Sequence, residues 1–311
     1  MEDVICNLCK SSNRIPLFEL YDFRFERVDQ CTSLVRCSQC GLVYQAPRPD
    51  ASEMKMHYPS DYEPYSFQDV LKSNSYLASR FRQYGINKRC RFITDYKNKG
   101  RLLEIGCGTG EFLNSMANKP GWEAYGLEIN PDISEATRQK YNLNIKSGTL
   151  EQANYQTSFF DAIALWDVLE HLHDPMGALQ EIYRILKPDG LLVMRVPNLD
   201  SWDANIFGKY WVGLDAPRHL YVFDVNTLSE ILRQSGFQIK KMSCEFGSQA
   251  SFILSIRFWL AGRGKKTKAS KMFLNIVSHP LTKLVMAPYF LLIGLSLKGP
   301  ELTSLAIKKT M

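Results

Sequence analysis

The chain has 311 residues, 45% of them hydrophobic and 23% charged, with a formal net charge of +6. These values predict a globular protein of one or two domains, and the mild positive charge permits an anionic substrate or membrane surface without implying nucleic acid. Eight cysteines in so long a chain exclude a disulfide scaffold. No basic and apolar signal segment opens the chain, so we expect a cytoplasmic protein.

The first 46 residues contain two Cys-x-x-Cys pairs. Cys6 and Cys9 form the first pair and Cys37 and Cys40 the second, with 27 residues between the pairs. Two such turns place four thiolates around one ion with no open position, which predicts a structural Zn²⁺ site. Short apolar segments between the pairs are typical of strands, so we assign residues 1–46 to a zinc ribbon. Redox activity and iron binding are the alternatives.

Acidic and basic side chains nearly balance within this ribbon. Phosphate contacts need a clear basic excess, so we do not expect a nucleic acid partner. We favour instead a role as a lid or substrate-contact module.

Residues 47–98 read as a linker followed by a helical lid. Pro47 and Pro49 indicate the linker. The aromatic stretch 57–65 either stacks on a ligand or packs the ribbon against the core. A basic amphipathic pattern over 75–97 predicts a helix that leads into the core.

From residue 99 onward, apolar strand patterns alternate with helical ones. Strands are expected at 101–105, 122–128, 143–147, 160–166 and 190–197, and helices at 110–118, 131–141 and 174–186. This alternation predicts parallel strands joined by crossover helices, hence an α/β fold. We expect a sixth strand at 238–246.

The first of these strands runs into Gly106-Cys107-Gly108-Thr109-Gly110. Glycines let the backbone turn sharply and approach a nucleotide-like ligand closely, with N–H groups presented to it. The next strand ends in Glu128, where a carboxylate is well placed to accept hydrogen bonds from ribose hydroxyls.

With Glu128, the LEHL segment 169–172 and the LKPDG turn 186–190, the glycine turn resembles the class I S-adenosylmethionine (SAM)-dependent methyltransferases. The LEHL segment is similar to that of the ubiquinone-type enzymes. The resemblance implies a Rossmann-like, doubly wound, seven-stranded sheet whose last strand is antiparallel, formed by residues 99–246 and 300–311. It implies SAM as cofactor, bound by Glu104, Gly106, Cys107, Gly108, Gly110, Glu128, Ile129, Thr149, Leu150 and Trp166. The family often has Asp where this chain has Thr149.

Catalytic candidates follow the fourth strand and the fifth. His171 and His219 are the candidate bases, since a neutral imidazole can take a proton from a hydroxyl, and Asp167 would lie beside the methyl donor. Purely structural roles for both histidines remain open. Asp167, Glu170, His171 and His219 together are also a possible set of ligands for a hard cation.

The aromatic segment 201–223 resembles a bacterial group with a W…PxHLxxF pattern, many of which are tied to modification of cell-surface sugars or small molecules. Trp211, Arg218 and Tyr221 are the expected substrate contacts, and Arg218 is suited to a phosphate or carboxylate. A structural turn is the alternative. The expected reaction methylates a hydroxyl of a sugar, glycolipid precursor or other small molecule. An RNA methyltransferase that uses the ribbon, and a non-catalytic SAM-binding or membrane-docking protein, are the alternatives.

Residues 247–299 form an insertion before the final strand expected at 301–308. It contains a basic stretch, 263–271, and an apolar run, 284–297. That run is shorter than the roughly 20 residues that a membrane-spanning helix needs. Residues 251–297 therefore form either an interfacial hairpin, which would suit a lipid-linked saccharide acceptor at the inner face of a membrane, or a buried or dimer-forming helical pair. The sequence leaves the oligomeric state open.

Overall fold

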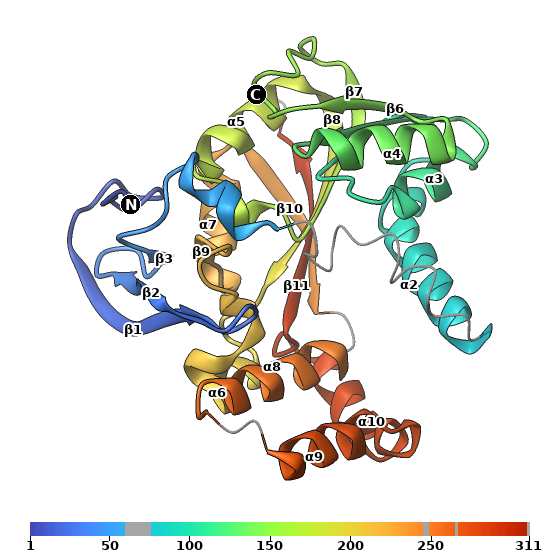
Figure 1. The fold of residues 1–311 in the computed structure, drawn as a ribbon. Coiled ribbons are helices and arrows are strands. Elements are labelled where there is room, and N and C mark those ends of the chain that lie inside the picture. Colours follow the sequence, from blue (N-terminus) through green and yellow to red (C-terminus); the bar gives the residue numbers. More distant parts are fainter. Residues whose placement is uncertain (60–75, 245–248, 265–266, 310–311) are drawn as a thin grey trace.

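The computed structural model describes residues 1–59, 76–244, 249–264 and 267–309 (Figure 1). Its centre is a seven-stranded sheet with the strand order β10-β11-β8-β7-β4-β5-β6. The strands are β4 (Gly100–Ile105), β5 (Trp122–Glu128), β6 (Asn144–Ser147), β7 (Phe160–Trp166), β8 (Leu186–Pro197), β10 (Phe237–Cys244) and β11 (Glu301–Lys308). Neighbours from β6 to β8 pair in parallel, whereas β11 is antiparallel to both β8 and β10.

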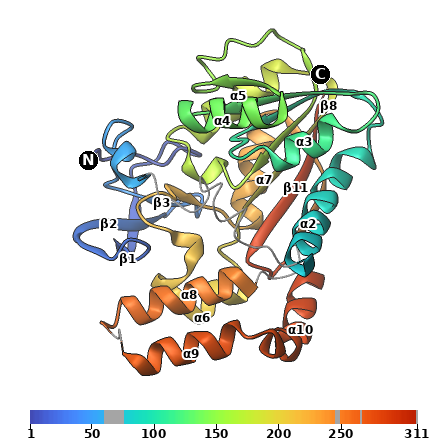
Figure 2. The same cartoon turned by 45° about the vertical axis from the view of Figure 1, so that its right-hand side comes forward.

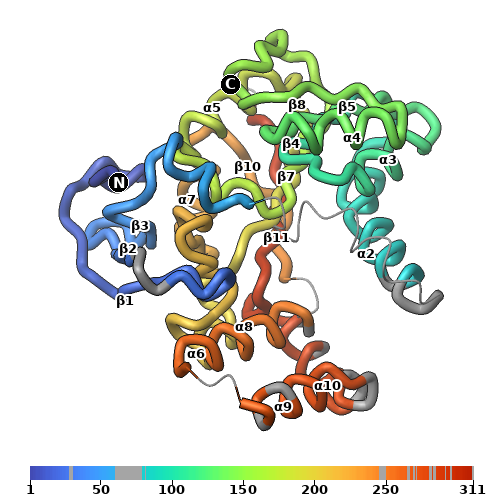
Figure 3. Tube along the Cα trace, in the orientation of Figure 1, coloured from blue at the N-terminus to red at the C-terminus, as the bar shows by residue number. Residues whose placement is uncertain are grey.

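The predicted fold is confirmed, down to the bounds of the final strand. Although β11 comes last in the chain, it is inserted between β8 and β10 near the middle of the molecule (Figure 3). Strand β7 occupies the centre of the sheet, and Ala162 to Leu165 are completely buried. An unbroken apolar run is what a parallel strand needs when helices cover both faces. Of the aromatic stretch 57–65, residues 60–65 lie outside the described part of the chain, as do residues 245 and 246 of the expected sixth strand.

Helices cover both faces of this sheet. On one face, α2 (Tyr76–Thr94) and α3 (Glu111–Ala117) pack their buried residues against β4, β7 and β8. On the other face, α5 (Pro175–Ile185) and α7 (Val225–Gln234) do the same. Helix α4 (Pro131–Tyr141) packs on β5 and β6. Local sequence sets the helix starts: the side chains of Asn130, Asp174 and Asp224 cap α4, α5 and α7, and a proline follows the cap in the first two.

The N-terminal segment forms a second, four-stranded sheet in the order β1-β2-β3-β9. Its strands are β1 (Arg14–Asp22), β2 (Arg27–Cys37), β3 (Val43–Gln45) and β9 (Tyr221–Val222). Three strands therefore come from residues 1–46 and the fourth from the segment after β8. Arg48 reinforces this junction, because its buried guanidinium donates to the Tyr221 hydroxyl at 2.9 Å and to the His173 carbonyl at 3.0 Å.

Four helices gather at the end of the molecule away from α4 and α5 (Figures 1 and 2). They are α6 (Trp202–Phe207), α8 (Gln249–Ala261), α9 (Lys268–Ser278) and α10 (Pro280–Leu295). The last three lie within the predicted insertion. Within the described residues, no helix combines the length and the hydropathy needed to cross a membrane.

Candidate functional site

A cavity of about 1190 Å³ opens at the carboxyl ends of β4, β5 and β7. Parallel α/β sheets bind ligands at this edge. Its walls come mainly from the loops after these strands and after β6, from residues 51–58 with Arg24 of the N-terminal segment, and from residues 211–219. Helix α2, Ser251 and the start of β11 add further lining residues. The cavity therefore lies between the central sheet and the N-terminal segment.

The glycine turn after β4 forms one wall, and two of its glycines are required by close packing. A Cβ added at Gly106 would lie 2.6 Å from a methyl of Val168, and one at Gly110 would lie 2.4 Å from a methyl of Thr137. A Cβ at Gly108 would meet nothing within 4 Å. All three residues have positive φ, at 69°, 48° and 72° in chain order. The turn thus leaves its backbone at Gly108 open to a ligand.

Two buried carboxylates flank this turn. Glu128, at the end of β5, accepts from the Gly108 N–H at 2.9 Å and from the Asn130 N–H at 3.0 Å. Burial nevertheless raises its pKa. Glu104 is 4% exposed, its Oε2 has no hydrogen-bond partner among the described residues, and burial raises its pKa well above the usual value, against the opposing charge of Arg89. The Trp166 indole N–H also has no hydrogen-bond partner among the described residues.

Gly110, also predicted to contact the cofactor, is not part of the cavity wall, whereas five further predicted residues line it beside Glu104, Gly106, Gly108 and Glu128. They are Cys107, Ile129, Thr149, Leu150 and Trp166. Ile129 is 64% exposed although it is apolar, so it offers a face for a flat ring. The Thr149 hydroxyl accepts from the Gln152 N–H at 3.3 Å, which holds the turn after β6.

A pair of histidines also lines the cavity. The rings of His171 and His219 are 4.6 Å apart between centroids and nearly perpendicular. Nδ1 of His171 lies 3.0 Å from the Arg218 carbonyl, and Nδ1 of His219 lies 2.8 Å from the Gly213 carbonyl. A carbonyl can only accept, so each Nδ1 carries the proton and each Nε2 keeps a lone pair.

Burial makes both imidazoles neutral at pH 7. Burial, followed by the neighbouring His219, lowers the pKa of His171 to about 3. Burial also lowers the pKa of His219. The Tyr58 hydroxyl lies 2.9 Å from Nδ1 of His171 and closes this side of the cavity. Two adjacent nitrogen lone pairs in a partly buried position are suited to accept a proton or to bind a cation.

Glu170 completes a cluster with the two histidines. It is fully buried, its two carboxylate oxygens have no partner among the described residues, and burial raises its pKa well above the usual value. One ligand atom from each of Glu170, His171 and His219 lies within 4.8 Å of the others. Three of the four residues considered as cation ligands are therefore brought together, and Asp167 is not among them.

A family model described as a methyltransferase domain matches residues 76–241, which is 166 of the 311 residues. The chain belongs to this methyltransferase-domain family. It resembles demethylmenaquinone methyltransferase of Chlorobaculum parvum, with 26% identity over 171 residues, covering 49% of this chain and 71% of that protein. It also resembles the uncharacterized protein MJ1252 of Methanocaldococcus jannaschii, with 32% identity over 143 residues, covering 44% of this chain and 52% of that one.

A solved SAM-dependent methyltransferase from Archaeoglobus fulgidus superposes with a TM-score of 0.51 at 19% identity, covering 78% of this chain and all of that one. At such low identity the likeness shows the fold alone. The family, its SAM-dependent relatives and the seven-stranded sheet show that the protein is a class I SAM-dependent methyltransferase.

Asp167 does not fit its predicted catalytic role in this methyltransferase. Its carboxylate accepts from Nε of Arg195 at 2.9 Å, and Arg195 also pairs with Glu301 at 3.1 Å. Burial alone would raise the pKa of Asp167, but Arg195 lowers it overall. Both of its oxygens already accept hydrogen bonds from Arg195, so the carboxylate is held in an ion pair instead of being free to take a substrate proton. Asp167 still lines the cavity, and its positive backbone φ of 58° sets the direction of its side chain.

Two of the three predicted substrate contacts of the methyltransferase are corrected by burial. Arg218 is completely buried and donates to Asp22 at 2.8 and 2.9 Å and to Asp215 at 2.9 and 3.2 Å. Tyr221 is 1% exposed and is absent from the cavity wall, because its hydroxyl is bonded to Arg48 and His173. Trp211 does line the cavity, although it is 1% exposed and packs mainly into the N-terminal sheet.

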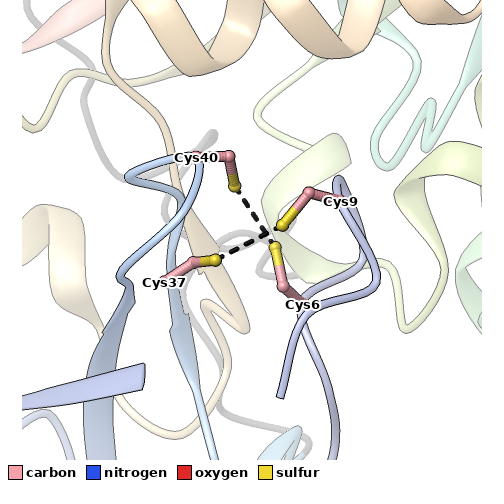
Figure 4. Close-up of side chains that lie close together, drawn as sticks. All are labelled: Cys6, Cys9, Cys37 and Cys40. Carbon is pink, nitrogen blue, oxygen red and sulfur yellow. Dashed lines mark hydrogen bonds between the residues drawn. The ribbon is translucent and has the colours of Figure 1, made fainter. Parts of the chain in front are cut away.

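The four cysteines of the two pairs meet at one point (Figure 4). The Sγ atoms of Cys6 and Cys40 are 3.4 Å apart, as are those of Cys9 and Cys37, and none of the four forms a disulfide. Four sulfurs held tetrahedrally at about 2.3 Å from Zn²⁺ lie roughly 3.8 Å from one another. The arrangement therefore fits one tetrahedral metal ion.

Several residues of the methyltransferase cavity were not found from the sequence. Arg24, Met54 and Arg89 line it from segments that precede the core. No local pattern marks them, because only the tertiary fold brings them to the strand ends. Arg195 was also missed, although a lone arginine in the apolar strand β8 is a signal for a buried carboxylate partner.

Proposed function

We propose that this methyltransferase transfers the methyl group of SAM to a hydroxyl of a sugar, a glycolipid precursor or another small molecule. The observation that carries the proposal is the pair of neutral, partly buried imidazoles, His171 and His219, in the wall of the cavity that the glycine turn also lines. A hydroxyl is a weak nucleophile until a base takes its proton during attack.

The residues around the glycine turn fit the cofactor. The free backbone face at Gly108 suits the methionine part of SAM, and the remaining lone pairs of Glu128 suit the ribose hydroxyls. The unpartnered oxygen of Glu104 is suited to the ammonium group of the amino acid moiety. When bound, SAM supplies an electrophilic methyl group.

The chain's own contribution is then positioning and proton transfer. The cavity walls orient the acceptor and exclude water, which is worth several orders of magnitude in rate. Nε2 of His171 or His219 accepts the hydroxyl proton, while the carbonyls of Arg218 and Gly213 hold both rings in the required tautomer.

The size and lining of the cavity support this acceptor class. At about 1190 Å³ it exceeds the 300–1,000 Å³ of typical ligand pockets, so it has room for a second molecule beside SAM. Aromatic and charged side chains such as Trp211, Tyr58, Arg24 and Lys55 also line the cavity. Such a mixture suits a polyhydroxylated, anionic acceptor, in keeping with the sequence resemblance to enzymes of cell-surface sugars.

For the N-terminal sheet, we propose a structural Zn²⁺ ion on Cys6, Cys9, Cys37 and Cys40. The four thiols fit its geometry, and a closed four-sulfur site leaves no position for catalysis. The ion would fix the turn before β1 to the turn that joins β2 and β3, and β3 pairs with β9 beside the histidine loop.

The test is methyl transfer from radiolabelled SAM into a host extract, partitioned into lipid, polysaccharide, RNA and small-molecule fractions. We expect label in the lipid, polysaccharide or small-molecule fraction, and label in RNA alone would refute the acceptor class. The variants His171→Asn and His219→Asn identify the base. The variant that lacks the base should have a kcat lower by about 10²–10⁴-fold with unchanged SAM affinity. An unchanged kcat in both variants would refute the proton-transfer role.

A further inference from the structure

The positive charge of this protein is concentrated in one segment. Residues 246–300 contain eight lysines and arginines and no aspartate or glutamate. The other 256 residues hold the remaining 30 basic and all 32 acidic side chains, so they are close to neutral. This segment contains the helices α8, α9 and α10.

The same helices expose apolar side chains that a surface helix normally buries. Met272, Phe273 and Ile276 of α9 are 63%, 46% and 56% exposed. At helical spacing they share one face, while Leu274 and Val277 on another face pack toward α8. In α10, whose sequence carries Lys283 as its single charge, Val285 is 79% and Leu292 62% exposed.

Exposed apolar groups beside a purely basic segment match a lipid surface with anionic headgroups. Apolar side chains enter the headgroup and acyl boundary, while lysine and arginine bind the headgroups. Arg263, after the end of α8, and Lys268, the first residue of α9, are both exposed. A face for a second copy of this chain would need acidic residues to match the basic ones, and residues 246–300 offer none.

These helices are fixed to the wall of the cavity. The N–H of Val212 donates to the hydroxyl of Ser255 in α8 at 3.0 Å, and the hydroxyl of Tyr289 in α10 donates to Asp203 at 2.8 Å. Ser251 at the start of α8 lines the cavity itself. Any external surface that binds these helices therefore lies at a fixed position relative to the cavity.

We propose that α8, α9 and α10 dock this enzyme onto an anionic membrane surface, and that its acceptor is lipid-linked. The second part rests on the proposed function, and the first does not. Figures 1 and 2 show the three helices together at one end of the molecule, which leaves them accessible to a flat surface.

The experiment is co-sedimentation of the full-length protein with vesicles of phosphatidylcholine alone or mixed with phosphatidylglycerol. We expect binding to the mixed vesicles, at least tenfold weaker binding to phosphatidylcholine alone, and weakening at high salt. The variant Met272→Gln/Phe273→Ser/Ile276→Asn should bind at least tenfold less. The matched control Ile15→Asn/Phe18→Ser, which removes two exposed apolar side chains of β1, should bind as the unchanged protein does.

Equal binding of the triple variant, or no binding of the unchanged protein to mixed vesicles, overturns the docking surface. Light scattering adds a second readout: conversion of a dimer to a monomer by the triple variant would assign this face to a second copy instead. SAM titration separates this inference from the proposed function. If the protein binds SAM but not vesicles, only the docking proposal is refuted. If it binds vesicles but transfers the radiolabelled methyl group only to RNA, only the proposed acceptor class is refuted.

Discussion

Replacing Arg218 by methionine tests whether this arginine holds the fold or binds the acceptor. The guanidinium is completely buried between Asp22 of β1 and Asp215, which are 2% and 3% exposed. Burial alone would raise the pKa of Asp215, but Arg218 and Arg24 lower it, so the carboxylate is charged in the folded protein. Methionine has a similar length and fills the space without the charge.

The loss of stability in Arg218→Met depends on the hydrogen-bond partners that Asp215 and Asp22 keep. Asp215 keeps Arg24, at 3.1 Å, whereas Asp22 loses both of its bonds to Arg218 and keeps the N–H of Phe25 at 3.2 Å. Removing one partner of a buried ion pair costs about 3–5 kcal/mol of unfolding free energy. For a chain of this size, that lowers Tm by about 10 °C.

Thermal unfolding followed by circular dichroism measures the effect. The double variant Asp22→Leu/Arg218→Met should recover at least half of the lost Tm, since it removes the uncompensated carboxylate and leaves Arg24 paired with Asp215. Arg233→Met, whose arginine is exposed and pairs with Glu230, should change Tm by no more than about 2 °C. An unchanged Tm in Arg218→Met together with a tenfold higher KM for the acceptor would refute the structural role.

Three further predictions concern the cofactor, the metal and acid stability. Glu128→Gln should weaken SAM binding about 10–100-fold in calorimetry, because a charged acceptor is lost, and equal affinity would exclude a ribose contact. Cys37→Ser should lower bound zinc from about one ion per chain to a small fraction and lower Tm, and metal analysis that finds no zinc in the unchanged protein would refute the site. The folded-state pKa of Asp215 lies below its unfolded value, so the ionised carboxylate stabilises the fold fully above about pH 4 and this stabilisation is lost as the pH falls further. An unfolding free energy in urea that does not change between about pH 5 and pH 3 would contradict this prediction.

The central sheet could be predicted because its signals are local. Apolar runs end at glycine or proline turns, and the helices between them begin at Asn130-Pro131 and Asp174-Pro175, so predicted bounds differ from the observed ones by a few residues. The join between the two sheets could not be predicted. It depends on two short strands, β3 and β9, which pair across about 180 residues, and no local pattern records that register.

The candidate site divides in the same way. Gly108 and Glu128 lie in motifs whose spacing predicts their positions in the site, whereas only the tertiary fold brings Arg24 and Tyr58 to the cavity. Arg218 was misassigned for a different reason. Its position beside His219 suggested a ligand contact, but the sequence does not reveal that Asp22, 196 residues earlier, already occupies its guanidinium.

The N-terminal sheet and the histidine pair are parts of one framework. The side chain of Gln45 in β3 donates to the His219 carbonyl at 2.7 Å, and the guanidinium of Arg218 is held by β1. On the other side, the Leu220 N–H donates to the Glu170 carbonyl at 2.8 Å, next to His171. The backbone of the His219 loop is therefore fixed by both the ribbon and the LEHL segment. A structural metal in the ribbon would then serve methyl transfer indirectly, because loosening β3 would release the carbonyl that orients this loop, while the glycine turn and Glu128 would keep their geometry.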